Sequence, residues 1–264
     1  MLKLEKITKT FNPGTVNQKT ALNNLSLTLN DGDFVTVIGG NGAGKSTMLN
    51  AVSGVWELDS GKIQIDDIDV TNMPEYKRAR YLGRVFQDPM KGTAADMEIQ
   101  ENMALARRRG KRRGLGWGIT KAEKEQFREE LKILGLGLED RMTNKVGLLS
   151  GGQRQALTLL MATIQKPKIL LLDEHSAALD PKTAKNVLEL SDELVRTNKL
   201  TTLMITHNMN DAIRYGNRLI MMKNGKIIFD VSGEEKKHLT TGQLVEMFSL
   251  SSGEEFSNDR ALLG

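Results

Sequence analysis

The sequence contains no cysteine among its 264 residues. This excludes disulfide bonds, thiolate zinc sites and cysteine nucleophiles, and it is compatible with the reducing cytoplasm. No apolar run approaches the ~20 residues that a membrane-spanning helix needs, so any membrane role is expected to depend on a partner. Residues 1–7 mix charged with apolar side chains, so no signal peptide is expected.

A strong excess of one charge is missing outside a single segment. The formal net charge is +4, but residues 107–113 hold six basic and no acidic side chains, so the rest of the chain carries a net charge of −2. A broad basic surface for nucleic acid is therefore not expected. Two interpretations of segment 107–113 remain open: contact with anionic lipid headgroups, at about 1 kcal/mol per charge, or a solvated, flexible loop.

A glycine-rich segment fits the pattern G-x-x-x-x-G-K-[ST]. An apolar, β-branched run at 34–38 precedes it, and a run suited to a helix at 48–52 follows it. Glycines let successive backbone N–H groups converge on an anion, and a helix N-terminus adds partial positive charge. We therefore predict a nucleoside triphosphate site in which Lys45 reaches the β- and γ-phosphates and Ser46 contacts Mg²⁺. Its residues are Gly39, Gly40, Asn41, Gly42, Ala43, Gly44, Lys45, Ser46 and Thr47.

The order of patterns predicts an α/β fold of the P-loop NTPase class, with a RecA-like, mainly parallel core. Strand-like runs at 1–32, 82–86, 169–172 and 203–206 are separated by helical patterns, and helix formers dominate at 97–109 and 121–134. We predict one domain over 1–264. Its parts are an α/β core with an antiparallel β layer (1–87 and 166–264) and an inserted α-helical subdomain (88–165). Local patterns predict a turn at 59–61, a hairpin around Asn224-Gly225, and a short polar tail from 231 to 264 without a further domain.

An acidic pair ends the apolar strand at 169–172, where open α/β sheets bind ligands. Asp173 is the expected carboxylate for Mg²⁺, and Glu174 is the candidate general base that polarises an attacking water. Gln87 follows another strand and is a candidate for the metal's water shell, although exposed strand-end glutamines are common. His207 follows a third strand and is a candidate contact to the γ-phosphate, although a lone histidine is more often structural.

A second helix start carries glycines. Ser150, Gly151, Gly152 and Gln153 form a capping box at a second potential anion site. Two such sites for one nucleotide suggest a head-to-tail dimer in which each copy covers the triphosphate bound by the other. Phe11 belongs to a predicted loop with Pro13-Gly14, where its ring either stacks on the base or packs into the local core.

Together these motifs resemble the nucleotide-binding subunit of ATP-binding-cassette (ABC) transporters. They occur in the family's order over nearly the whole chain, and the Leu149-Ser150-Gly151-Gly152-Gln153 element makes the match specific. The resemblance implies two ATP molecules held between two copies of the chain, with hydrolysis resetting the dimer. It also implies that Thr47 binds phosphate and Mg²⁺, that Asp180 crosses the dimer, that Phe11 stacks on adenine, and that Gln87 senses both the metal and the membrane partner.

The resemblance further implies the partners and the location of the chain. An importer subunit of this kind works at the cytoplasmic face of the membrane with a separate permease and, as a rule, an extracytoplasmic solute-binding protein. The helical region between Gln87 and Ser150 would then receive the permease. The amino-acid sequence of residues 173–180 resembles that of a subgroup with members linked to aromatic amino acids. His175 departs from the family, which usually has proline or alanine there; it either tunes Glu174 or touches the interface, or it is a benign surface residue.

Three alternatives remain at this stage. A soluble ABC-type ATPase that acts on nucleic acid or ribosomes would carry long coiled coils or tandem cassettes, and an exporter subunit often has fused membrane helices; the sequence has neither feature. A P-loop kinase would leave the Ser150 element and His207 unexplained. We therefore predict an ATP-hydrolysing subunit that powers solute import, with ATP and Mg²⁺ as cofactors and no direct nucleic-acid partner.

Overall fold

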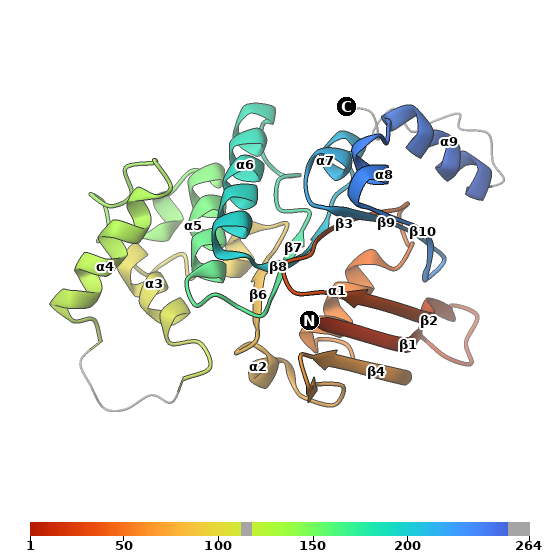
Figure 1. Ribbon diagram of the computed structural model, residues 1–264. Helices are drawn as coiled ribbons and strands as arrows, with labels where there is room; N and C mark the ends of the chain where they lie inside the picture. Colours follow the sequence, from red (N-terminus) through yellow and green to blue (C-terminus); the bar gives the residue numbers. More distant parts are fainter. Residues whose placement is uncertain (112–117, 253–264) are drawn as a thin grey trace. The chain divides into compact units, whose positions relative to one another are not determined.

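The computed structural model describes residues 1–111 and 118–252, in two compact units (Figure 1). Unit 1 comprises Met1–Arg78 and the chain from Lys199 onward, and unit 2 comprises Ala79–Asn198. Each unit is described below by itself. The division of the chain into a core and a helical subdomain at 88–165 was predicted from motif order, and its boundaries stay a prediction.

An antiparallel sheet in unit 1 confirms the β structure predicted for residues 1–32. Its strands lie in the order β2-β1-β4-β5, and Leu2, Leu4 and Ile7 of β1 point into the core. The predicted turn at 59–61 is wrong, because Ser60 already begins β4. Gly61 (φ +96°) lies against a bulge in β1, where an added Cβ would come within 2.5 Å of the Lys6 carbonyl oxygen. The strands are β1 (Leu2–Phe11), β2 (Lys19–Leu29), β4 (Ser60–Ile65) and β5 (Ile68–Asp69).

A second group of strands in unit 1 is mainly parallel, as predicted. β3 pairs in parallel with β8 on one side and with β9 on the other, and every residue of β3 and β8 is buried. Such strands read as continuous apolar runs because both faces are covered. Asn224 and Gly225 both have positive φ, which confirms the predicted hairpin turn between β9 and β10. The strands are β3 (Phe34–Ile38), β8 (Thr201–Ile205), β9 (Arg218–Lys223) and β10 (Lys226–Ser232).

Helices of unit 1 flank these strands. The C-terminal end of α1 is closed by the buried Arg78, whose guanidinium donates to the carbonyls of Ala51 and Val52 at 2.7 and 3.0 Å. The tail was predicted as polar only, yet it forms α8 and α9, and Leu244 of α9 is buried beside Ile38 and Val231 in one hydrophobic cluster. The helices are α1 (Lys45–Ser53), α2 (Glu75–Arg78), α7 (Met209–Arg214), α8 (Gly233–Lys237) and α9 (Thr241–Ser252).

Unit 2 combines one parallel strand pair with helices. β6 and β7 pair in register from Leu82↔Ile169 to Val85↔Leu172. Helices α3 and α4 confirm the helical runs predicted at 97–109 and 121–134; α3 is two residues shorter at each end, and α4 is two residues shorter at its C-terminal end. The elements are β6 (Leu82–Val85), the 3-10 helices η1 (Pro89–Gly92) and η2 (Val146–Leu148), α3 (Ile99–Arg107), α4 (Lys121–Lys132), α5 (Gly151–Thr163), β7 (Ile169–Asp173) and α6 (Pro181–Asn198).

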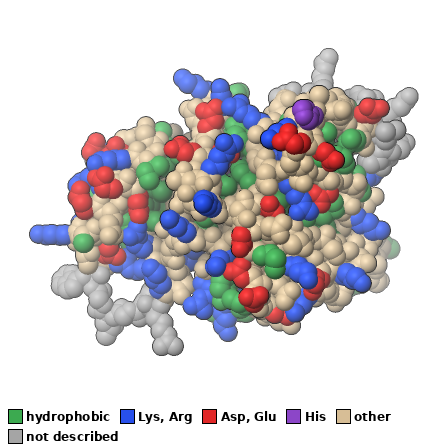
Figure 2. All heavy atoms as spheres, viewed as in Figure 1, with side chains coloured by type: hydrophobic (Ala, Val, Ile, Leu, Met, Phe, Trp, Pro, Cys, Tyr) green, Lys and Arg blue, Asp and Glu red, His purple; other side chains and the backbone are tan. Residues whose placement is uncertain are grey.

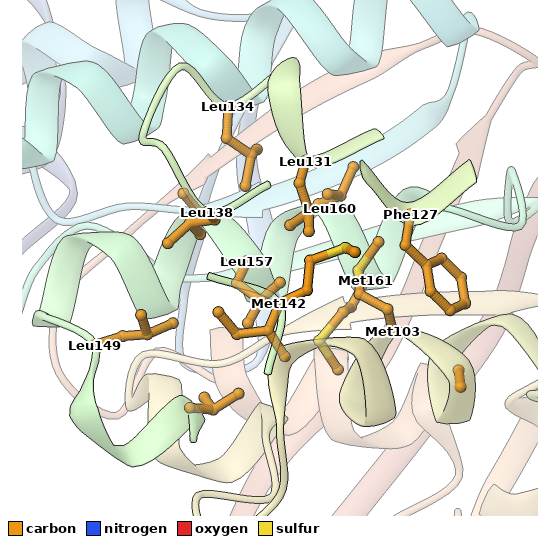
Figure 3. Close-up of a cluster of buried hydrophobic side chains, with 14 residues drawn as sticks. Met103, Phe127, Leu131, Leu134, Leu138, Met142, Leu149, Leu157, Leu160 and Met161 are labelled. Atoms are coloured by element: carbon orange, nitrogen blue, oxygen red, sulfur yellow. The ribbon is translucent and has the colours of Figure 1, made fainter. Parts of the chain in front are cut away.

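The core of unit 2 is a cluster of aliphatic, methionine and phenylalanine side chains between α3, α4 and α5 (Figure 3). Phe127 of α4, Met103 of α3 and Leu157 of α5 are fully buried in it. The outer side of α4 is charged instead, with Arg128–Glu125 and Lys132–Glu129 pairs, and acidic and basic side chains are mixed over this region in Figure 2. The helix is therefore amphipathic and anchored by its apolar side.

The described part of segment 107–113 does not fit the interpretation of a solvated, flexible loop, while contact with anionic lipid stays a prediction. Arg107 pairs with Glu130 of α4, and Arg108 pairs with Glu123 of α4 at 2.8 Å. Arg109 donates to the Ala162 carbonyl of α5 at 3.1 Å, and its burial lowers the pKa of its guanidinium. These arginines thus tie α3 to its neighbouring helices. Lys111 is exposed, while Arg112 and Arg113 lie outside the described residues.

Candidate nucleotide-binding site

The backbone of the phosphate loop requires glycine at defined positions. Gly39 has φ +151°, and an added Cβ would lie 2.3 Å from the Met222 carbonyl oxygen of β9. Gly44 has φ +103°, and its Cβ would lie 2.3 Å from the Ala21 carbonyl oxygen of β2. Other residues would clash with these carbonyls and be strained at such φ values. The flanking strands β2 and β9 therefore fix the path of the loop that the sequence motif predicted.

Lys45 begins α1 at the end of this loop. Its side chain is buried, and Nζ donates to the carbonyl oxygens of Gly39 and Gly40 at 2.6 and 3.2 Å. No side chain caps the N-terminus of α1, and the helix dipole places partial positive charge at this end. Ser46 is exposed at this end. A buried ammonium beside a helix N-terminus is an arrangement that binds an anion such as a phosphate.

Phe11 is the last residue of β1, and the prediction that it lies in a loop is wrong. Its ring is half-buried and packs edge-to-face on Trp56, with the ring centroids 5.4 Å apart. Lys9 Nζ lies 5.8 Å from the Phe11 ring centroid and 3.4 Å from Asp59 Oδ1. Trp56 follows α1 and is 41% exposed. No local pattern predicted this partner, because the pairing depends on the return of the chain after α1.

His207 lies at the same sheet edge as the phosphate loop. Strands β3 and β8 are parallel and in register up to Val37↔Ile205, and the Thr206 N–H donates to the Val37 carbonyl at 3.2 Å. The loop follows β3 directly, and His207 follows β8. Asn208 caps the next helix, α7, by accepting from the N–H groups of Asn210 and Asp211. The half-buried His207 is therefore held between a strand end and a capped helix.

The acidic pair of unit 2 occupies the C-terminal end of β7. Asp173 Oδ2 lies 3.3 Å from Arg84 Nη2 of the neighbouring strand β6. Glu174 has φ +46°, a left-handed conformation that is uncommon outside glycine and asparagine. Strained backbone of this kind is often retained at functional sites. The contact of Arg84 with Asp173 was not predicted, since the two residues are far apart in sequence.

Gln87 is exposed just beyond the end of β6. Since β6 and β7 are parallel and paired up to Val85↔Leu172, Gln87 and Asp173 follow neighbouring strand ends. The preceding carbonyl, that of Phe86, accepts from Gln155 Nε2 of α5 at 3.1 Å. The structure thus brings the strand end that carries Gln87 against α5, the helix that follows the Ser150 element.

The Ser150 element has the predicted capping box. Gln153 N–H donates to Ser150 Oγ at 3.3 Å, and Ser150 N–H donates to Gln153 Oε1 at 3.2 Å. An added Cβ on Gly152 would lie 2.2 Å from Thr183 Cγ2, so α5 and α6 begin side by side. Asp180 accepts from the Thr183 N–H at 3.1 Å, and the hydrogen bonds from Thr183 lower the pKa of the Asp180 carboxyl. Asp180 and the Ser150 element therefore lie at two adjacent helix starts.

His175 is buried, contrary to the prediction of a benign surface histidine. Its Nε2 lies 2.8 Å from Ser191 Oγ of α6, and burial lowers the pKa of the imidazole from 6.5 to about 4. Ser191 stands on the apolar stripe of α6 with Val187 and Leu194. A polar residue on such a stripe is a signal, available in the sequence, that a polar partner lies opposite.

Residues 1–111 and 118–252 contain no group of three or more His, Cys, Asp or Glu side chains that could hold a metal ion. In nucleotide sites Mg²⁺ is usually bound by one or two carboxylates together with phosphates and water, so such a group is not required. No helix in this part of the chain is long and apolar enough to cross a membrane.

Comparisons with known proteins agree with the motifs. The family model described as ABC transporter matches residues 22–177. A tyrosine transport ATP-binding protein of Clostridioides difficile is 44% identical over 248 residues, which are 94% of this chain and 98% of that protein. A spermidine/putrescine import ATP-binding protein of Haemophilus influenzae is 35% identical over 89% of this chain, and the match spans 59% of that longer protein.

The solved structures that this chain resembles are also ATP-binding cassettes. A dimeric ATP-binding cassette in a post-hydrolysis state, bound to ADP and Pi, has a TM-score of 0.75 and 30% identity, covering 88% of this chain and 98% of that one. The ADP conformation of another transporter cassette has a TM-score of 0.77 and 29% identity, covering 94% and 98%. The predicted α/β P-loop NTPase fold is confirmed, and a P-loop kinase or a nucleic-acid-directed ATPase is not favoured. This chain belongs to the ABC transporter family, as an ATP-binding and ATP-hydrolysing subunit.

Proposed function

We propose that this chain powers the import of an aromatic amino acid through a separate membrane-spanning permease. The observation that carries the proposal is the 44% identity to a tyrosine transport ATP-binding protein along nearly the full length of both chains. Relatives named for spermidine/putrescine and for glycine betaine/carnitine/choline are 35% and 33% identical. In this proposal the subunit is peripheral, on the cytoplasmic face of the membrane, and works with an extracytoplasmic solute-binding protein.

Unit 1 would bind the nucleotide. Phe11 stacks on adenine, while Lys45 and the loop N–H groups bind the β- and γ-phosphates. Ser46 and Thr47 hydroxyls contribute oxygen ligands for Mg²⁺ and phosphate. His207 contacts the γ-phosphate and orients the attacking water. The burial of Lys45 and the position of His207 at the loop's sheet edge support these roles.

Unit 2 would supply the acidic groups. Asp173 and the Gln87 amide oxygen suit Mg²⁺, because this metal prefers hard oxygen ligands. When bound, Mg²⁺ neutralises charge on the phosphate oxygens. Glu174 accepts a proton from the attacking water, and its left-handed backbone conformation supports a functional role. The exposed Ser150 and Gly151, with Gly152, Gln153 and Asp180, would act across a dimer on the nucleotide of the other copy.

Uptake assays in the source strain test the proposed solute. Deletion of the gene should abolish high-affinity uptake of labelled tyrosine, and the parent gene should restore it. Glu174→Gln is the matched control, because it preserves size and nucleotide binding but removes the proposed base. Spermidine and glycine betaine uptake should be unchanged. Normal tyrosine uptake in the deletion strain, with loss of either other solute, would contradict the assignment.

A further inference from the structure

The ammonium of Lys19 lies at the exposed tip of the phosphate loop. A Cβ built on Gly42 would be 2.7 Å from Lys19 Nζ and 3.8 Å from its Cε. Gly42 is exposed and has φ +77°, and Lys19 is exposed as well, so the ammonium and the tip of the loop are both accessible from solvent. The motif G-x-x-x-x-G-K-[ST] does not include Lys19, which precedes the loop by about twenty residues.

The pairing of β1 with β2 accounts for this position. Phe11 and Lys19 are direct cross-strand partners, as are Thr10 and Thr20, whose hydroxyl oxygens are 3.2 Å apart. Cross-strand partners project from the same face of a sheet. The turn at 12–18 closes the hairpin, with Gln18 Oε1 accepting from the Gly14 N–H at 2.7 Å. The proposed adenine-stacking ring and the Lys19 ammonium therefore belong to one side of the same hairpin end.

Strand β2 approaches the loop at a second point. The Ala21 carbonyl oxygen would lie 2.3 Å from a Cβ on Gly44, and Ala21 stands two residues after Lys19 on the same strand. Residues two apart on a strand share a face. The backbone contact at Gly44 thus fixes the start of β2 beside the loop, so the position of Lys19 does not depend on its flexible side chain alone.

Lys19 also differs from Lys9 and Lys62 of the same sheet in its partners. Lys9 and Lys62 pair with Asp59 and Asp69, each at 3.4 Å. Within residues 1–111 and 118–252, no carboxylate forms an ion pair with Lys19. A positive charge without a carboxylate, at the tip of a glycine-rich loop that leads into a helix N-terminus, favours an anionic ligand.

We propose that Lys19 is a further nucleotide-binding residue, which contacts the phosphates of the nucleotide bound by the loop. Phe11 and Lys19 then form a cross-strand pair in which one residue contacts the base and the other the phosphate chain. This inference rests on nucleotide binding at Gly39–Gly44, and it adds a residue that the family motifs do not include. Because the site is exposed, losing the contact should weaken binding about threefold to tenfold.

The test compares two affinities of the full chain. The affinity for ADP is measured by calorimetric titration, and the affinity for adenosine is measured by its competition with a fluorescent ADP analogue. Lys19→Met keeps the aliphatic stem and removes the charge, and Lys19→Arg restores a charge. Lys62→Met is the matched control, since it removes one positive charge from the same sheet. Lys19→Met should weaken ADP about threefold to tenfold and leave adenosine unchanged, while Lys19→Arg and Lys62→Met bind like the parent.

Each other outcome counts against the inference. ADP affinity equal to the parent in Lys19→Met would remove the phosphate contact. An equal loss of affinity for ADP and for adenosine would mean that Lys19 maintains the shape of the site and does not contact the phosphates. A parent chain that fails to bind ADP would contradict the nucleotide site itself, and this result is distinguishable because Lys45→Ala would then have no further effect.

Discussion

His175 Nε2 lies 2.8 Å from the hydroxyl oxygen of Ser191, and both residues are buried in unit 2. Ser191 donates its one hydroxyl hydrogen to the Val187 carbonyl at 2.7 Å. The imidazole must therefore donate from Nε2, so the neutral ring is held in a single tautomer. This hydrogen bond joins the residue after Glu174 to the middle of α6.

Burial of neutral His175 makes stability depend on pH. Its pKa is about 4 in the folded chain and 6.5 in the unfolded one, so the unfolded chain takes up a proton first as the pH falls. Above pH 6.5 His175 is neutral in both states and does not lower the free energy of unfolding. As the pH falls from 6.5 to about 4, protonation of the unfolded chain lowers that free energy, by roughly 3 kcal/mol at most. Urea unfolding at several pH values should show this loss in the parent.

His175→Gln should remove that part of the pH dependence, whereas His238→Gln, at an exposed position, should leave it intact. An identical pH profile for the parent and His175→Gln would contradict the role of His175.

Lys236 gives a test of the same sign at high pH. It is buried, its ammonium donates to the carbonyls of Tyr215 and Gly216, and desolvation lowers its pKa from 10.5 to about 8. Between pH 8 and 10.5 the unfolded chain keeps a proton that the folded chain has lost, so this group makes stability rise with pH. Comparing Lys236→Met with Lys237→Met, whose lysine is exposed and pairs with Glu234, isolates the effect. The absence of any difference between the two variants over this range would refute it.

Arg108 should stabilise the helices of unit 2. Its guanidinium pairs with Glu123 at 2.8 Å and donates to the Gly118 carbonyl at 2.6 Å. Arg108→Ser should lower the free energy of unfolding by about 1 kcal/mol, because the ion pair is only partly exposed. Lys111→Ser, in the same basic segment but exposed, should have no measurable effect in thermal melts. Equal melting temperatures for the two variants would show that Arg108 does not stabilise the helices of unit 2.

The fluorescence of Trp56 should show whether an adenine base stacks on Phe11. The two rings are 5.4 Å apart, and the only other tryptophan is Trp117. In a Trp117→Phe background, ADP should change the tryptophan emission. Phe11→Leu should weaken ADP several-fold and Phe11→Tyr should not, since stacking contributes about 1–3 kcal/mol per base. If Phe11→Leu binds ADP as tightly as Phe11→Tyr, adenine does not stack on residue 11.

Local signals in the sequence predicted most of the elements that hold the site. The capping box of Ser150 and Gln153, the buried run of β3 and the Asn224-Gly225 hairpin each depend on neighbouring residues, and all three are present. Gly61 was assigned to a turn because glycine is a turn signal in a sequence. In the structure its positive φ accommodates a bulge in β1, a strand distant in sequence. Tertiary contacts of this kind are not encoded in a short window of sequence.

Other side-chain positions depended on packing between distant segments. The contact of Arg84 with Asp173, the Trp56–Phe11 pair and the position of Lys19 at Gly42 each join residues that sequence spacing does not relate. Helix α9 was missed although Leu244 is fully buried and Val245, Met247 and Phe248 pack against the same hydrophobic cluster. The burial of His175, in contrast, has a local signal in the sequence, because Ser191 is a polar residue on the apolar stripe of α6.

The central claim is that two copies of this chain join around ATP, with the Ser150 element of each copy contacting the nucleotide of the other. The most direct measurement is the mass of Glu174→Gln by light scattering with saturating ATP and Mg²⁺. The account predicts a dimer, which Lys45→Ala in the same background abolishes because the nucleotide is no longer held. A strictly monomeric Glu174→Gln chain that has bound ATP would contradict it.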